Sequence, residues 1–97
     1  MPTYITLVNY TQKGIENIKE SPARLDKVKE AMKAAGGEFK AFYLTLGSYD
    51  MVVISEAANA QAYAATMLAI GAAGAVRSET LKAFTEEEYR NIIASLP

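Results

Sequence analysis

The chain has 97 residues, a net charge of −1, and neither cysteine nor histidine. Without cysteine there are no disulfides or thiolate sites, and without histidine the commonest metal ligand and general base is missing. Ten basic and eleven acidic residues are mixed along the chain, so nucleic acid is not expected as a partner. The length suits a single domain, residues 1–97, for which we predict no cofactor and no metal.

Two features of the sequence bear on localisation. The N-terminal residues MPTYITLVNY lack the basic and apolar regions of a signal peptide. The longest apolar stretch, residues 62–76, is too short and too polar to span a membrane. We therefore expect a cytoplasmic protein without membrane contacts.

The first predicted strand is TYITLVNY, residues 3–10, because β-branched and aromatic side chains favour a pleated surface. Neither of its alternating faces is fully polar, so both are expected to be covered. A short helical piece follows around Ile15 and Ile18. Ser21 as N-cap and Pro22 in the first turn then predict a helix that ends at Gly36-Gly37.

Two β-rich runs, residues 37–46 and 49–57, flank Gly47-Ser48 and predict an antiparallel hairpin. Glu56, near the end of the second run, is expected to be solvated. Strict alternation along the first run places one set of side chains on each face of the sheet. One set is Phe39, Ala41, Tyr43 and Thr45, and the other is Lys40, Phe42, Leu44 and Leu46.

Asn59 is the predicted cap of a helix that begins at residue 60. Residues 75–84, AVRSETLKAF, predict a fourth strand. Thr85 and Glu88 form the pattern of a capping box, which begins a last helix. The apolar stripe of that helix is Tyr89, Ile92, Ile93 and Leu96.

The predicted order β-α-β-β-α-β-α describes an α+β, ferredoxin-like fold with a four-stranded antiparallel sheet. Right-handed crossovers place both main helices on one face of this sheet. The other face also carries large apolar groups, and an apolar face of that size needs a partner. A second copy packed sheet to sheet is the economical solution, which gives a dimeric α/β barrel.

Four stretches resemble a known family: TQKGIENIKESPAR, AFYLTLG, LGSYDMVVISEA and VRSETLKAFTEEEY. The chain is similar along its length to GYD domain proteins, named for a Gly, Tyr and Asp at the turn between the second and third strands. Here Ser48 stands between the glycine and the tyrosine, which we take as a variable position. The resemblance implies a small, largely uncharacterised bacterial protein of the dimeric α/β barrel type.

The candidate ligand-binding residues come from the hairpin and the fourth strand. Asp50 is either a half-buried carboxylate at the rim of the barrel or an ordinary acceptor for backbone N–H groups in the turn. Arg77 and Glu79 point to one side of their strand, either toward a ligand or as charges that protect a sheet edge. The full set of candidates is Tyr43, Thr45, Tyr49, Asp50, Arg77 and Glu79.

Three functions fit these features. The first is a small-molecule-binding or interaction module that forms a homodimer or a higher oligomer. The second is a cofactor-free enzyme, similar to a monooxygenase or isomerase, with Asp50 as base and Tyr43 or Tyr49 orienting the substrate. The third is a ligand sensor that works with a separate DNA-binding protein. The sequence names no ligand and no reaction.

Overall fold

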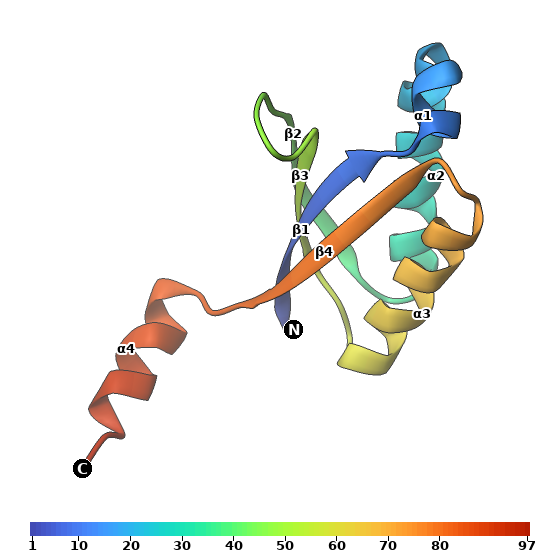
Figure 1. The fold of residues 1–97 in the computed structure, drawn as a ribbon. Helices are drawn as coiled ribbons and strands as arrows, with labels where there is room; N and C mark the ends of the chain where they lie inside the picture. Colours follow the sequence, from blue (N-terminus) through green and yellow to red (C-terminus); the bar gives the residue numbers. More distant parts are fainter.

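The computed structural model describes all 97 residues and contains one four-stranded antiparallel sheet. Its strands are β1 (Thr3–Tyr10), β2 (Glu38–Leu44), β3 (Met51–Glu56) and β4 (Val76–Ala83). They lie in the order β2-β3-β1-β4, so β1 is central and β2 and β4 are the edges (Figure 1). The predicted α+β class, the antiparallel sheet and the edge position of the fourth strand are confirmed.

The helices are α1 (Gln12–Glu16), α2 (Ser21–Ala34), α3 (Ala60–Ala72) and α4 (Glu86–Ala94), with a 3-10 turn, η1 (Ile18–Glu20), before α2. Asn59 caps α3 by accepting the Ala62 N–H, at 2.8 Å. Thr85 and Glu88 form the predicted capping box of α4. The Thr85 N–H hydrogen bond lowers the pKa of the Glu88 carboxyl below its usual value. Gly36, with φ of 82°, ends α2 as predicted.

The predicted N-cap role of Ser21 is wrong. The residue before it, Glu20, has helical dihedrals and ends η1, so the chain enters α2 directly from a 3-10 turn. The Ser21 hydroxyl instead lies 2.8 Å from the Tyr10 hydroxyl and ties the start of α2 to the end of β1. Pro22 does lie in the first turn of α2, where its missing N–H costs nothing.

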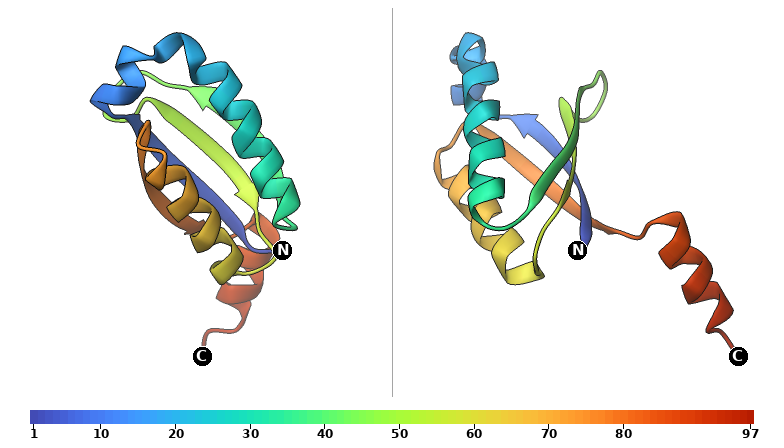
Figure 2. Two further views of the ribbon diagram at one scale, coloured as in Figure 1. Left: turned by 90° about the vertical axis from the view of Figure 1, so that its right-hand side faces the viewer. Right: turned by 180° about the vertical axis from the view of Figure 1, so that it is seen from behind.

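Both long helices, α2 and α3, cover the same face of the sheet (Figure 2). Alternate residues of the two central strands are buried on this face, as the pleat of a strand requires. Tyr4 stacks on Tyr63 of α3, with ring centroids 4.1 Å apart, and Met67 packs against the pair. The buried strand residues are Tyr4, Thr6, Val8, Met51, Val53 and Ser55.

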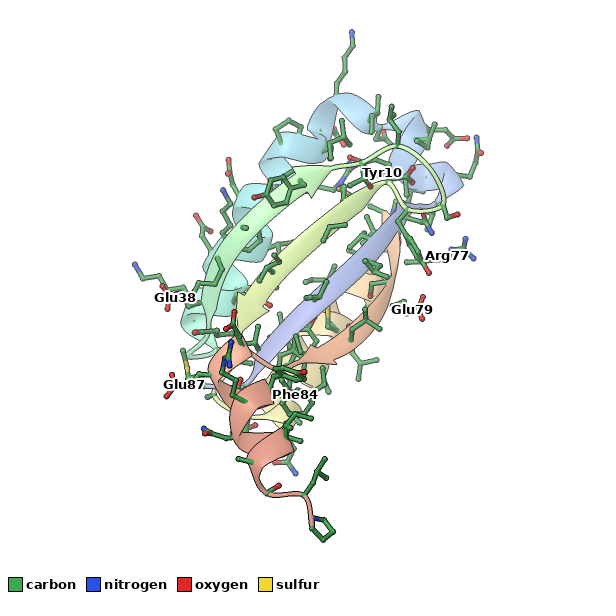
Figure 3. The ribbon with its side chains drawn as sticks, turned by 90° about the vertical axis from the view of Figure 1, so that its left-hand side faces the viewer. Tyr10, Glu38, Arg77, Glu79, Phe84 and Glu87 are labelled. Atoms are coloured by element: carbon green, nitrogen blue, oxygen red, sulfur yellow. The ribbon has the colours of Figure 1, made fainter.

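The opposite face of the sheet has no helix over its centre, and we call it the open face (Figure 3). Pairing fixes its residues, because directly opposed residues of antiparallel strands share a face. Ile5 lies between Ile54 and Leu81, and Leu7 lies between Val52 and Glu79. The sheet is not closed, and within one chain the side chains of Ile5, Leu7, Val52, Ile54 and Leu81 form an apolar surface.

A bulge in β2 changes one predicted face. The pairing with β3 shifts between Phe39 and Ala41, so Lys40 is the extra residue. Phe39 therefore pairs with the buried Ser55, and Lys29 of α2 lies 5.2 Å above its ring. Phe39 is on the helix-covered face, not beside Tyr43 as strict alternation predicts.

Helix α4 extends away from the rest of the molecule, beyond the end of β4 and on the open side of the sheet (Figures 1 and 2). The Cα radius of gyration is 14.7 Å. A compact chain of this length is expected to have about 12.5 Å. None of the helices is long and apolar enough to cross a membrane.

Candidate functional site

The hairpin between β2 and β3 is held by hydrogen bonds from three of the predicted site residues. The Thr45 hydroxyl donates to the Tyr49 carbonyl at 2.6 Å, and the Thr45 N–H donates to the Asp50 carbonyl at 2.8 Å. Gly47, with φ of 115°, supplies the turn conformation that other residues rarely adopt. Thr45 therefore has a structural role in the loop, whatever else it contacts.

The Asp50 carboxylate closes the ladder between β1 and β3. Its Oδ2 accepts the Tyr10 N–H at 2.9 Å, and the Asp50 N–H donates to the Val8 carbonyl at 2.9 Å. Asp50 thus replaces a backbone acceptor where β1 leaves the sheet and the chain turns into α1. Asp50 accepts a backbone N–H, as in the second alternative for this residue, but the donor lies at the end of β1 and not in the turn.

We expect Asp50→Ala to lower the free energy of unfolding by about 2 kcal/mol, because it leaves the half-buried Tyr10 N–H without a charged acceptor. Asp50→Asn keeps an oxygen at the same place and should cost about half as much. Urea denaturation measures both values. Asp26→Ala, at an exposed position of α2, is the control, and an equal loss in all three variants would contradict this role.

Tyr49 reaches across the open face to the far edge strand. Its hydroxyl donates to Oε2 of Glu79 on β4 at 2.5 Å, although 30 residues separate the two. The hydrogen bond to Glu79, together with repulsion from its charge, raises the pKa of the Tyr49 phenol above its ordinary value. The pair is polar and exposed, and it lies at the end of the sheet where the hairpin joins β3.

The remaining candidates, Arg77 and Tyr43, flank this pair. Arg77 pairs with Asn9 and shares its face with Glu79, two residues along β4 (Figure 3). Tyr43 lies on β2, the other edge strand, where it pairs with Val52 of β3, and 60% of Tyr43 is exposed. Four of the six predicted residues, Tyr43, Tyr49, Arg77 and Glu79, thus border the open face, whereas Thr45 and Asp50 hold the hairpin.

Glu56 is not solvated as the sequence suggested. Only 20% of its side chain is exposed, and Oε1 lies 4.0 Å from Nζ of Lys40. Its Oε2 and the neighbouring Ser55 hydroxyl are both buried without a hydrogen-bond partner in the chain. No three acidic side chains lie close enough together to hold a metal ion.

An apolar cleft lies on the other side of the sheet and contains none of the six predicted residues. It is a cleft of about 530 Å³ between α2, α3 and the sheet, and 16 of its 22 lining residues are hydrophobic. We call it the α2–α3 cleft; its floor includes Val8, Met51 and Val53, and its walls include Leu25, Val28, Ala65 and Ala69. The only indication of this cleft in the sequence is the high alanine content of α3, because small side chains leave space between helices unfilled.

The architecture is that of a small α+β protein whose antiparallel sheet is covered by helices on one face. The family model of the GYD domain matches residues 4–93, and the chain belongs to this family. The family resemblance predicted from the sequence is thereby confirmed.

One relative is 36% identical over 84 residues, which cover 86% of this chain and 88% of the relative. It is the glutamine synthetase and cystathionine beta-lyase binding protein of Thermus thermophilus. The crystal structure of TTHA0845, also from Thermus thermophilus, superposes with a TM-score of 0.56 at 22% identity. The superposed region covers 88% of this chain and 95% of the Thermus chain, which supports the fold described above.

Proposed function

We propose that this protein is a cytoplasmic binding module, a ferredoxin-like domain that pairs with a second copy through its open face to form a dimeric α/β barrel. The uncovered apolar face of the sheet carries this proposal. Ile5, Leu7 and Ile54 lie at its centre, and water would hydrate them in an isolated chain. Two copies related by a twofold axis would present the same residues to each other.

The binding partner is proposed to be another protein. The relative from Thermus is named for binding two metabolic enzymes, and its likeness extends over most of both chains. The polar border of the open face, Tyr49 with Glu79 and Arg77, would remain at the mouth of the assembled pair. There it offers hydrogen-bond donors and acceptors to an enzyme surface or to a small polar ligand.

We expect Leu7→Lys to abolish pairing through the open face at micromolar concentration, which lowers the measured mass. Two ammonium groups would be buried opposite apolar residues, at a cost of about 3 kcal/mol or more, which weakens pairing about 100-fold. Light scattering coupled to size-exclusion chromatography measures the mass. Gln61→Lys, on an exposed turn of α3, introduces the same charge and should leave the dimer intact.

Circular dichroism checks that the Leu7→Lys chain is folded. A wild-type monomer at micromolar concentration would refute pairing through the open face. Binding of the host's glutamine synthetase and cystathionine beta-lyase is then measured by biolayer interferometry. Failure to bind either enzyme would refute the partner class while leaving the dimer untouched.

A further inference from the structure

The α2–α3 cleft is a gap in the core that its own chain does not fill. Val8, Met51 and Val53 form its floor, so the opening reaches the central strands of the sheet. Two of the five α3 residues that line it are alanines, Ala65 and Ala69, and the cleft has a volume of about 530 Å³. An apolar cavity of this size forgoes the dispersion contacts that close packing would supply.

The apolar surface continues outside the cleft, over α3. This helix has no charged residue in its 13 positions, and Leu68 on its outer side is 75% exposed. A helix that is apolar all round is normally buried on all sides. A groove between two helices can accept a third helix through its apolar face, and a helix seated there would also lie beside the exposed apolar residues of α3.

Helix α4 has the complementary shape. Its apolar stripe consists of Tyr89, Ile92 and Ile93, which have the spacing of one helix face and are each at least 42% exposed. The helix ends at Ala94, so Leu96, which the sequence assigned to the stripe, follows the helix and is also exposed. Nine residues give α4 a length of about 13.5 Å, shorter than the helices of about 20 Å that border the cleft. The large apolar side chains of α4 face no partner, and the apolar cleft has a volume that could hold them.

The charges of the two surfaces are also complementary. Helix α2 carries four cationic and two anionic side chains, and Arg24 and Lys27 line the cleft. Helix α4 carries three anionic residues and one cationic residue. Glu86 pairs with Arg90 and Glu88 completes the cap, which leaves Glu87 available to a cation of α2. Opposite charges at the rim would fix the orientation of the helix in the cleft.

The helix cannot enter the cleft of its own chain. Only Phe84 and Thr85 join β4 to α4, and two extended residues span about 7 Å. Figure 1 shows α4 on the side of the sheet opposite α2 and α3, and Figure 3 shows Phe84 and Glu87 on that open side. The occupant therefore has to come from another molecule.

We propose that α4 of one copy docks its apolar stripe in the α2–α3 cleft of a second copy. The contact joins two different surfaces, so it links molecules head to tail, in a closed ring if the rotation between neighbours closes and in an open chain if it does not. It lies on the face of the sheet opposite the open face. Docking in the cleft therefore adds to the pairing proposed above and gives assemblies larger than a dimer.

The lack of cysteine allows a direct test by cross-linking. A tagged Ile93→Cys chain is mixed with an untagged Ala69→Cys chain and oxidised mildly. Disulfides form only where the Cα atoms approach to within about 7 Å, so the two chains should cross-link several times more than the Asn91→Cys control with Ala69→Cys. Asn91 lies on the opposite side of α4 from the stripe.

Three outcomes would overturn the proposal. Equal cross-linking of Ile93→Cys and Asn91→Cys would mean that the stripe does not face the cleft. Preferential cross-linking of Ile93→Cys to Leu7→Cys would place α4 on the open face instead. A disulfide within single molecules of an Ile93→Cys, Ala69→Cys double variant at high dilution would mean that α4 fills its own cleft.

A mass measurement separates this contact from pairing through the open face. Ile93→Asp should reduce the assembly to a dimer, whereas Leu7→Lys removes the dimer contact. Asn91→Asp adds the same charge to the other side of α4 and should leave the mass unchanged. Native mass spectrometry of the wild type completes the test by detecting any small molecule bound to the protein. If the wild type retains such a molecule, and if the Ile93→Asp assembly has the same mass as the wild-type assembly, docking of α4 in the cleft is refuted.

Discussion

Substitution of Gly14 by alanine is expected to destabilise the protein by about 3 kcal/mol, which lowers the melting temperature by about 10–20 °C. A Cβ at this position would lie 2.1 Å from the carbonyl oxygen of Ala75 and 3.3 Å from the Tyr10 ring. The backbone cannot move aside easily, because Thr11 binds the same segment: its N–H donates to the Ala75 carbonyl and its hydroxyl donates to the Gly74 carbonyl. Thermal unfolding followed by circular dichroism measures the change.

Gly71→Ala is the matched control for Gly14→Ala. Gly71 lies near the end of α3 with a negative φ, and a Cβ there would meet no atom within 4 Å. Alanine has the better helix propensity, so this variant should be more stable than the wild type by about 0.5–1 kcal/mol. If both glycine variants lost stability equally, steric contact with Ala75 would not be the cause.

Tyr63→Phe is expected to cost about 1–3 kcal/mol although it removes a single oxygen atom. The Tyr63 hydroxyl shares a hydrogen bond with the hydroxyl of Thr6, a residue that is only 2% exposed, and lies 3.4 Å from the Thr80 hydroxyl. Without it the Thr6 hydroxyl has no partner in the core. Tyr63→Ala also removes the ring stacked on Tyr4, and its cost should rise to about 3–5 kcal/mol.

A double-mutant cycle tests the origin of this loss. Thr6→Val removes the other hydroxyl, so the pair Thr6→Val, Tyr63→Phe buries no unsatisfied oxygen between these residues. Its stability should exceed the value expected from the sum of the single variants, as measured by urea denaturation. Tyr43→Phe, at an exposed ring, is the control, and strict additivity in the cycle would contradict the proposed coupling.

The elements of this fold were predictable from local patterns. Alternation of β-branched and aromatic residues identified β1 with its correct bounds, and Asn59 and Thr85 marked two helix starts through their side chains. The N-cap prediction for Ser21 was wrong because an N-cap residue needs an extended backbone, whereas the chain reaches Ser21 from η1 with a helical backbone. Phe39 misled because a bulge depends on pairing between strands, which the sequence of one strand does not contain.

The candidate site was predictable only in part. The sequence selected Tyr49 and Glu79 separately, yet their contact depends on the order β2-β3-β1-β4 and on the reach of a tyrosine across two strands. The sequence also selected Asp50, whose carboxylate accepts a hydrogen bond from the Tyr10 N–H. The α2–α3 cleft was missed because a cavity depends on the distance between two helices, which the alanine-rich sequence of α3 suggests only indirectly.

The central position of β1 has a consequence for the order in which the chain folds. Both neighbours of β1 come later in the sequence, and β4 starts 66 residues after β1 ends at Tyr10, with Val76. During synthesis, and in any fragment that stops before Val76, one edge of β1 lacks its strand partner. An unpaired strand edge can form hydrogen bonds with other chains. These incomplete chains are therefore expected to aggregate and to bind chaperones more readily than the complete fold.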